Sequence, residues 1–420
     1  METTTNSIAN PHPLADITVL DLTIALAGPF ATLLLGGLGA RIIKVENPLS
    51  EDPARNNAPY LGAHGAKLVR ETKDDISVST LNRMRNKLGI TLNLKHPDAR
   101  AVFADLVRQA DIVFENFSSG TMDRLGVGYG FVRAVNPRAV YCALTGFGSD
   151  AQGKASGKAF DAIIQALSGL MQTSGLPDEP PVRVGVTFGD LVTPLFGVIG
   201  VLAALRVAEQ TGVGQFVDVS MLGALTSLVA CEPFDVLEQL GIPTRTGLTI
   251  PRLAPFGVYA AQDGYAAICA HQDAFARSVF VAMERPDLAA DDRFRTRDLR
   301  VKYVNELNAL IEAWAKTIPL AELLAKLEAA GVPCAEVRDP QTAVRDPRVV
   351  ARGETVPLVH PKYGAVADVY GMGFPVKFSA ATAGYDQPPP EVGEHNQLVY
   401  GEILGYSAEQ LAALRAQGVI

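Results

Sequence analysis

Residues 17–46 read ITVLDLTIALAGPFATLLLGGLGARIIKVE. The apolar runs at 17–22 and 41–46 have the length and composition of buried strands, and the run from Gly28 to Leu38 has the length of a helix. A strand, a helix and a second strand in this order predict a βαβ unit, whose two strands lie parallel in one sheet. The chain is therefore expected to have an α/β fold.

The same alternation continues along the chain. We expect further strands at 88–94, 111–115, 139–144 and 215–219, and helices at 98–109, 161–171 and 190–210. This pattern predicts a Rossmann-like, doubly wound parallel sheet in a large α/β domain spanning residues 15–220. A last helix at 407–416 is expected to return to this domain, so that residues 395–420 complete it. Residues 47–80 are polar and rich in Pro and Asn, which predicts an excursion over the surface.

Beyond residue 240 the pattern changes to a smaller α+β domain, predicted over residues 245–345. Strands at 256–260 and 265–270 flank Gln262-Asp263-Gly264, a hairpin signal. Helices are expected at 273–283, 304–316 and 320–330. Residues 1–14 are predicted to be a flexible tail, and 221–244 and 346–394 to be linkers.

Composition limits the classes of function. The chain has 420 residues, a formal net charge of -8 and a pI near 5.4, which argue against nucleic acid or an anionic membrane as a partner. Its first ten residues lack the features of a signal peptide. The longest apolar runs, 25–40 and 191–205, are shorter than the roughly 20 residues that span a membrane. Four separated cysteines predict neither a metal site nor disulfides, and we expect a cytoplasmic protein.

Three common catalytic motifs are missing from the sequence. The turn after the first strand, Ala25 to Pro29, lacks the GxGxxG pattern of dinucleotide binding, although Glu46 stands where a ribose-binding acid would fall. No GxxxxGK[ST] or GxSxG motif occurs. No histidine lies between residues 97 and 270, where most of the α/β domain is expected. NAD binding, P-loop chemistry and serine–histidine catalysis are therefore not indicated.

Asp190 is the best-placed candidate nucleophile. It follows Gly189 and opens the apolar run 191–205. One interpretation is a helix cap, which is the usual role of an aspartate before an apolar run. The other is a nucleophile, because free amides at the helix start would keep the carboxylate ionised. In that case Gly189 would leave room for a substrate and a backbone amide for an oxyanion.

Basic residues form a second candidate site. Arg83, Arg85 and Lys87 precede an expected strand, Lys95 ends it, and Arg124 follows the next one. The carboxyl edge of a parallel sheet is where such folds bind ligands, so a phosphate-bearing ligand is one interpretation. A solvated basic face is the alternative.

Short segments in a fixed order also carry a family resemblance. They are Val19-Leu20-Asp21-Leu22, Ala27-Gly28-Pro29-Phe30-Ala31, Leu38-Gly39-Ala40, Ile43-Lys44-Val45-Glu46, Asn86-Lys87, Glu115-Asn116-Phe117, Asp123-Arg124-Leu125-Gly126, Asn136-Pro137-Arg138, Gly146-Phe147-Gly148, Gly185 with Gly189-Asp190, Ala203-Ala204-Leu205, Thr211-Gly212-Val213-Gly214-Gln215 and Gly393-Glu394-His395. Together they resemble the family III CoA-transferases, the group that includes formyl-CoA transferases and carnitine CoA-transferases. The resemblance runs from about residue 15 to the end of the chain.

The resemblance implies a CoA-transferase that acts on acyl-CoA and small carboxylic acids through an aspartyl anhydride and an aspartyl-CoA thioester. It makes Asp190 the catalytic residue. It implies CoA contacts at Leu26, Ala27, Leu92, Lys95, Asn116, Phe117, Ser118, Arg124, Lys158 and Phe160. No tightly bound cofactor is implied. The family fold pairs the large domain with a small one and interlocks two chains as a homodimer, or as a heteromer with a paralogous chain.

The sequence differs from the family pattern at two places, and two alternative functions remain open. The chain lacks the glycine-rich loop of some formyl-CoA transferases, and Asn47 replaces an arginine that contacts CoA, so oxalate and formate are not implied. An α-methylacyl-CoA racemase has the same fold but uses a histidine in a Gly-His-Asp segment, where this chain reads Gly157-Lys158-Ala159-Phe160-Asp161. A non-catalytic CoA-binding subunit is the other alternative, which the retained Gly189-Asp190 pair disfavours. The sequence does not identify the donor and acceptor acids.

Overall fold

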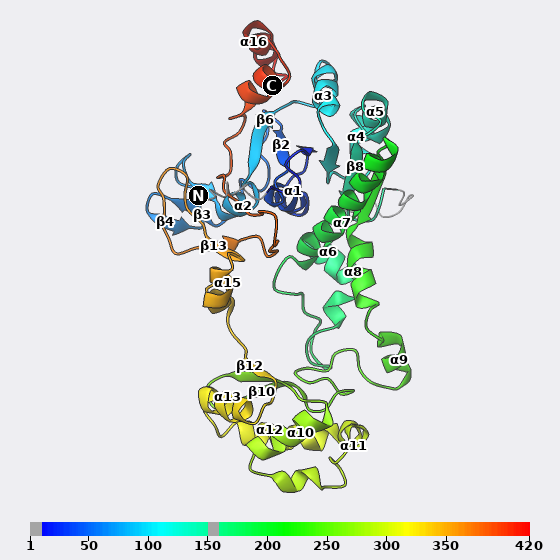
Figure 1. Cartoon of the computed structure of the whole chain (residues 1–420), viewed down its shortest axis with the longest axis vertical. Helices are drawn as coiled ribbons and strands as arrows, with labels where there is room; N and C mark the ends of the chain where they lie inside the picture. Colours follow the sequence, from blue (N-terminus) through cyan, green and yellow to red (C-terminus); the bar gives the residue numbers. More distant parts are fainter. Residues whose placement is uncertain (1–10, 150–158) are drawn as a thin grey trace, which may run out of the picture. The chain divides into compact units, whose positions relative to one another are not determined.

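A computed structural model describes residues 11–149 and 159–420 of the chain (Figure 1). Its largest sheet has six strands in the order β6-β2-β1-β7-β8-β9, and every neighbouring pair is parallel. The strands are β1 (Thr18–Asp21), β2 (Arg41–Glu46), β6 (Lys87–Thr91), β7 (Ile112–Glu115), β8 (Val140–Thr145) and β9 (Phe216–Ser220). This is the strand order of a doubly wound Rossmann-type sheet, so the predicted fold of the large domain is confirmed.

The order of the strands reverses between β1 and β7. From β1 the chain moves through α1 (Ala27–Gly37) to β2 on one side, and after β6 it crosses through α3 (Ala99–Arg108) to β7 on the other. In open sheets of this kind, a ligand binds in the crevice at the carboxyl ends of the strands where the order reverses. The loops that begin at Leu22 and Asn116 border that crevice.

The long helix α7 (Phe188–Thr211) packs against α1, β8 and β9. Gly197 allows a close approach, because a Cβ there would lie 3.2 Å from the ring of Phe114 at the end of β7. The helix is longer than expected, and by length and composition it alone among the described helices could span a membrane. Its contacts are those of a helix that covers a sheet.

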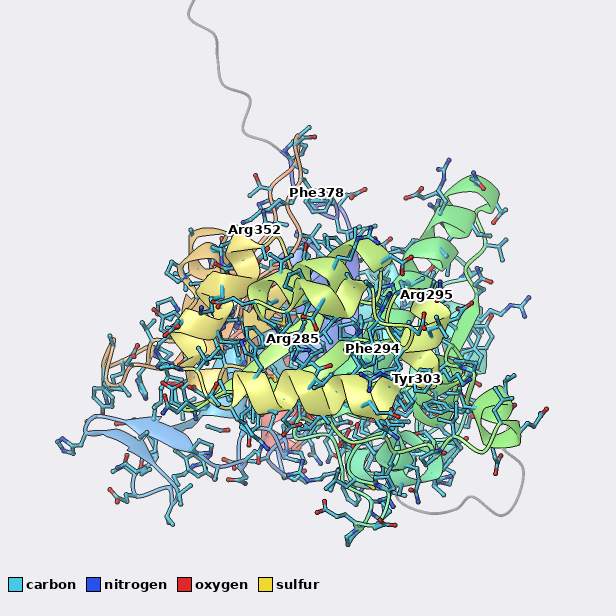
Figure 2. The ribbon with its side chains drawn as sticks, turned by 90° about the horizontal axis from the view of Figure 1, so that it is seen from below. Arg285, Phe294, Arg295, Tyr303, Arg352 and Phe378 are labelled. Atoms are coloured by element: carbon cyan, nitrogen blue, oxygen red, sulfur yellow. The ribbon has the colours of Figure 1, made fainter. Side chains whose placement is uncertain are left out.

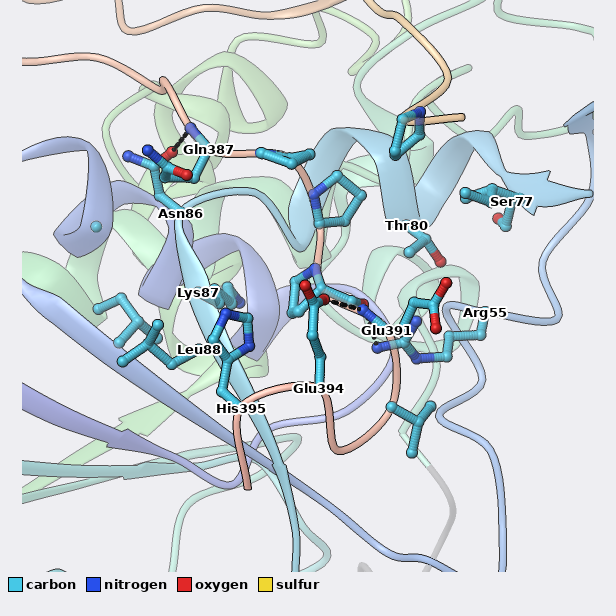
Figure 3. A pocket seen from close by; sticks show the side chains of 18 of the residues that line it. Arg55, Ser77, Thr80, Asn86, Lys87, Leu88, Gln387, Glu391, Glu394 and His395 are labelled. Carbon is cyan, nitrogen blue, oxygen red and sulfur yellow. Dashed lines mark hydrogen bonds between the residues drawn. The ribbon is translucent and has the colours of Figure 1, made fainter. Parts of the chain in front are cut away.

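The C-terminal segment closes the free edge of the sheet. The Gly89 N–H of edge strand β6 donates to His395 Nδ1 at 3.1 Å, and the Thr91 N–H donates to Asn396 Oδ1 at 2.9 Å. Figure 3 shows His395 beside β6, and Asn86, directly before this strand, accepts a hydrogen bond from the Gln387 N–H. These side chains occupy donors that a seventh strand would otherwise take. The Gly393-Glu394-His395 segment is therefore a structural edge cap.

Two stretches that appeared irregular in the sequence are structured. Residues 47–80 contain β3 (Tyr60–Gly62), β4 (Gly65–Lys67), β5 (Ile76–Ser77) and the start of α2 (Val78–Arg83), and the predicted linker 346–394 contains β13 (Thr355–Pro357) and β14 (Tyr370–Met372). Leu61, Leu81 and Leu358 are buried together, which ties the two stretches to each other. The prediction of a surface excursion was wrong because these few leucines find partners about 300 residues away.

The chain divides into two compact units: residues 1–168, 184–228 and 344–420, and residues 169–183 and 229–343. The second unit therefore begins earlier than the predicted small domain and includes residues 169–183. It has an antiparallel sheet of β10 (Phe256–Ala260), β11 (Tyr265–Cys269) and β12 (Cys334–Glu336), covered by α10 (Asp273–Ala282), α12 (Val304–Ala315) and α13 (Leu320–Ala329). Figure 2 labels Phe294, which is fully buried in the core of this unit.

The remaining described helices are short. In the first unit they are α4 (Thr121–Arg124), α5 (Tyr129–Val135), α6 (Asp161–Leu167), α15 (Pro347–Ala351), a π-helical turn at Gln397–Ile403 and α16 (Ala408–Ala416), while α8 (Met221–Val229) ends at the boundary. In the second unit they are α9 (Phe234–Gln239), α11 (Arg297–Lys302), α14 (Pro340–Ala343) and 3₁₀ turns at Leu170–Gln172 and Pro286–Ala289. In the first unit, Val399, Tyr400, Leu411 and Val419 join the same buried cluster as Leu92.

Candidate active site

Asp190 lies in the first turn of α7 and is half-buried. The helix N-cap is Thr187, and Asp190 does not perform that role. Within the described parts of the chain, the Asp190 carboxylate accepts no hydrogen bond from a protein group. The helix-cap interpretation is therefore wrong, and this carboxylate remains free for chemistry.

Asp161, at the start of α6, supplies the cap instead. Its Oδ1 accepts the Gly189 N–H at 2.8 Å and the Asp190 N–H at 3.4 Å, and its Oδ2 accepts from Gln165 Nε2 at 2.8 Å. Gln165 Oε1 in turn accepts the Val184 N–H at 2.9 Å. The segment that carries Asp190 is thus held in place by one turn of α6. The predicted free amides are occupied, because a carboxylate at a helix N-terminus satisfies them and is favoured by the helix dipole.

Gly189 allows helices α6 and α7 to approach each other closely. A Cβ on Gly189 would lie 3.2 Å from Asp161 Oδ1 and 3.6 Å from Ile164 Cγ2. The glycine therefore admits Asp161, and does not leave the expected room for a substrate. Its N–H is also donated to Asp161, so it is not the oxyanion donor that the sequence suggested.

The environment of Asp190 raises the pKa of its carboxyl group from 3.8 to about 6. Burial is the main cause, the negative charge of Asp161 adds to it, and the positive charge of Arg83 opposes it. At neutral pH the group is mostly ionised, yet it is more basic than an ordinary aspartate. Such a carboxylate suits nucleophilic attack, because nucleophilicity rises with basicity.

The loop after β1 is fixed by three side chains from separate parts of the chain. The N–H groups of Thr23, Ile24 and Ala25 donate to Asp21 Oδ1 at 2.9 Å, Asn116 Oδ1 at 2.8 Å and Asp52 Oδ1 at 2.9 Å. Asn116 Nδ2 also donates to the Ile24 carbonyl at 2.9 Å. These bonds hold Ala25 at a φ of 63°, a region that non-glycine residues seldom adopt. Both polar atoms of Asn116, a predicted CoA contact, are thus engaged with the loop.

Buried charges lie beneath this loop. Lys87 Nζ lies 2.9 Å from Asp21 Oδ2, and Lys44 Nζ lies 3.2 Å from Asp52 Oδ2, with all four side chains at most 1% exposed. Lys44 also donates to the Thr23 carbonyl. Burial opposes ionisation of Asp21, but Lys87 and Lys44 outweigh it and lower its pKa. Lys87 is therefore a structural cation, which corrects its assignment to a ligand-binding basic cluster.

A pocket of about 390 Å³ lies at the carboxyl ends of β2 and β6. Leu92, Lys95 and Phe117, three of the predicted CoA contacts, line it together with Asn47. Lys95 is exposed at its rim, and Leu92 is buried in its wall. The position matches the ligand crevice of a doubly wound sheet.

The other predicted contacts lie at the start of α1, after β7 and beside Asp161. Leu26 is half-buried and Ala27 is buried at the start of α1, while Ser118 and Arg124 are exposed beyond β7. Arg124 donates to Thr121 Oγ1 at 2.8 Å. Phe160 is 66% exposed beside Asp161. Lys158 lies outside the described residues.

A larger pocket of about 1070 Å³ lies in the same unit (Figure 3). Its lining includes Arg41 and Lys87, which begin strands β2 and β6, and His395 from the edge cap. It therefore borders the amino ends of these strands, away from the crevice where such folds bind ligands. The smaller pocket is the better candidate for the substrate site.

Comparisons with known proteins identify the family of the chain. A family model described as CoA-transferase family III matches residues 14–396. The chain is 32% identical to the succinyl-CoA–D-citramalate CoA-transferase of Chloroflexus aurantiacus over 98% of each protein, and 36% identical to the acetyl-CoA:oxalate CoA-transferase of Acetobacter aceti over 91% of this chain and 92% of that one. A crystal structure of a CAIB/BAIF family protein from Brucella suis, 31% identical, aligns with a TM-score of 0.78 over 94% of this chain and 100% of the other. The chain is an enzyme of the family III CoA-transferases.

Proposed function

We propose that this enzyme moves CoA from an acyl-CoA donor to a carboxylic acid through covalent intermediates on Asp190. One observation carries the proposal: the Asp190 carboxylate accepts no hydrogen bond from the described residues, while Asp161 takes over the capping of its helix. The carboxylate is therefore positioned by its backbone and left reactive.

The reaction passes through two kinds of intermediate. The Asp190 carboxylate attacks the thioester carbonyl of the donor, the C–S bond breaks, and CoA thiolate leaves a mixed anhydride on the enzyme. The thiolate then attacks the Asp190 carbonyl, which releases the donor acid and forms an aspartyl-CoA thioester. The acceptor carboxylate attacks that thioester, which expels CoA thiolate and forms a second mixed anhydride between the acceptor and Asp190. The thiolate then attacks the acceptor's carbonyl in this anhydride, which forms the new acyl-CoA and releases the Asp190 carboxylate. Splitting the exchange in this way replaces one slow displacement with easier steps.

CoA is assigned to the crevice at the carboxyl ends of the strands. The contacts proposed from the resemblance are Leu26, Ala27, Leu92, Lys95, Asn116, Phe117, Ser118, Arg124, Lys158 and Phe160. Lys95 and Arg124 are exposed cations suited to phosphate groups. Asn116 has the further role of fixing the loop after β1.

The acceptor is assigned to the dicarboxylic acids. The two relatives described above are named for succinyl-CoA with D-citramalate and for acetyl-CoA with oxalate. Succinate, citramalate and oxalate each carry two carboxyl groups, so one can react while the other is recognised.

The assembly of the enzyme is proposed from the family resemblance, and its location from the four separated cysteines. We expect an interlocked homodimer, or a heteromer with a paralogous chain, in the cytoplasm. We expect no tightly bound cofactor, since CoA enters and leaves as part of the substrates.

Chemical trapping of the covalent intermediate tests this mechanism. After incubation with an acyl-CoA, hydroxylamine or borohydride treatment should modify Asp190 and no other residue, as read by peptide mapping. Modification at another carboxylate, or none while transfer continues, would contradict the mechanism. Deuterium incorporation at the α-carbon of a 2-methylacyl-CoA, without an acceptor acid, would instead support the racemase alternative.

The pKa of Asp190 predicts an acidic limb in the pH–rate profile. Because the attacking form is the carboxylate, kcat/KM should fall as the pH drops below about 6. The Asp161→Asn variant retains an oxygen to accept the Gly189 N–H but loses the neighbouring negative charge, so its limb should move to lower pH. The substrates titrate identically with both enzymes, so they cannot cause a difference between the two pH–rate profiles. If the acidic limb of Asp161→Asn lay at the same pH as that of the wild type, Asp161 would not contribute to the raised pKa of Asp190.

A further inference from the structure

We propose that residues 418–420 hold the loop that carries Lys95 in place and so raise the affinity of the enzyme for CoA. These residues form a positioning segment. The proposal rests on the proposed binding of CoA in the pocket at the carboxyl ends of β2 and β6. Three observations lead to it: how the segment turns, which groups donate to its backbone, and what those groups hold in place.

The positioning segment follows α16 through a tight turn. Gly418 has a φ of 73°, which glycine adopts without steric cost. The Gly418 N–H donates to the Arg415 carbonyl at 3.0 Å, and the Val419 N–H donates to the Leu414 carbonyl at 2.9 Å, the Schellman pattern of a helix C-terminus. The Val419 side chain is fully buried in the same core cluster as Leu92. The turn therefore directs the chain back into the core beside the end of β6.

The backbone of the segment is bonded to the wall of the pocket. The Val419 carbonyl accepts the Asn93 N–H at 2.8 Å, and Asn93 Nδ2 donates to the Gly418 carbonyl at 3.4 Å. Asn93 belongs to the 92–95 loop, all of which lines the pocket, whereas the described lining includes none of residues 418–420. The segment thus holds the loop without being part of the pocket itself.

Asn93 transmits this support to the rest of the loop. Its Oδ1 accepts the Lys95 N–H at 3.3 Å, and its carbonyl accepts the His96 N–H at 2.8 Å. All four polar groups of Asn93 are therefore used, two with the segment and two with the chain that follows. Lys95 is an exposed cation at the rim of the pocket, and a cation binds a phosphate well only when it is held in position. Release of the Val419 carbonyl should loosen Asn93 and, with it, Lys95.

Deletion of residues 418–420 tests the proposal. KM for the acyl-CoA donor should rise about 3- to 10-fold, the effect of one lost hydrogen bond on binding. The kcat value and KM for the acceptor acid should stay unchanged, because the deletion leaves the segment that carries Asp190 intact. Steady-state kinetics with both substrates varied measures these three values.

Leu411→Ala is the matched control. Leu411 lies on α16 and is buried in the same core cluster as Val419, so this variant also loses apolar contacts but keeps residues 418–420. Partial unfolding lowers the amount of active enzyme and hence kcat, so Leu411→Ala should leave KM for acyl-CoA unchanged. An equal rise of KM in both variants, or no rise in the deletion variant, would overturn the proposal. If Lys95→Met also left KM unchanged, the assignment of CoA to this pocket would be wrong as well.

Hydrogen exchange in the wild type tests the same coupling without a variant. Coupling between two sites is reciprocal, so bound CoA should stabilise the segment by the factor by which the segment favours CoA. Saturating CoA should therefore slow exchange in peptides covering residues 414–420 about 3- to 10-fold, together with slower exchange at residues 88–95. Slower exchange at residues 88–95 alone would overturn the proposal.

Discussion

Asparagine in place of Asp190 should lower kcat for CoA transfer by about 10⁴-fold or more, the scale seen when a catalytic nucleophile is removed. Asparagine has nearly the same shape but cannot form the anhydride or the thioester. Since the Asp190 carboxylate accepts no hydrogen bond from the described residues, the substitution leaves no donor unsatisfied. The loss should therefore be chemical, with KM for acyl-CoA nearly unchanged.

The same variant should be at least as stable as the wild type. The pKa of Asp190 is raised in the fold, so the group favours folding at low pH, and this contribution is lost as the pH rises from 3.8 to about 6. At neutral pH the ionised carboxylate thus costs up to about 3 kcal/mol. Thermal unfolding at pH 7.5 should show an equal or higher Tm, and a clear decrease would indicate a structural role for Asp190.

The arrangement of the parallel sheet could be predicted because it rests on local patterns. The runs 17–22 and 41–46 carry their own strand signal, and short right-handed connections leave few topologies open. The boundaries of α1 and α7 differ from the prediction by at most two residues at either end. Asp190 is a candidate nucleophile in the sequence for the same reason, as a carboxylate between a glycine and an apolar run.

What surrounds Asp190 could not be predicted, because it comes from distant residues. The cap on its helix is Asp161, 28 residues from the Gly189 N–H that it accepts, and the opposing charge is Arg83 on α2. The one signal of this arrangement in the sequence is the four-residue spacing of Asp161 and Gln165, which places both on one helix face. That spacing does not show which groups the two side chains contact. Likewise, a basic run from Arg83 to Lys87 gives no sign that Lys87 would be buried.

Substitution of Lys87 by methionine should destabilise the first unit by about 3–5 kcal/mol, because it leaves the charge of Asp21 in a fully buried site. Lys87 also donates to the Pro29 carbonyl at 3.0 Å and to Thr32 Oγ1 at 2.7 Å, and these acceptors would lose a donor as well. Urea unfolding followed by circular dichroism measures the loss. Trp314 lies in the second unit, so its fluorescence follows that unit separately.

Two control variants test whether the unpaired charge of Asp21 causes the loss of stability in Lys87→Met. Asp21→Asn in the Lys87→Met background removes the unpaired charge while keeping an oxygen for the Thr23 N–H, and should recover most of the lost stability. Lys95→Met removes an exposed lysine from the rim of the proposed CoA pocket, so it should raise KM for acyl-CoA with unfolding unchanged within about 0.5 kcal/mol. If Lys87→Met unfolded like Lys95→Met, the ion pair with Asp21 would not stabilise the fold. Lys87 would then behave like an exposed lysine, although its side chain is fully buried at the start of β6 and that of Lys95, beyond the end of the strand, is exposed.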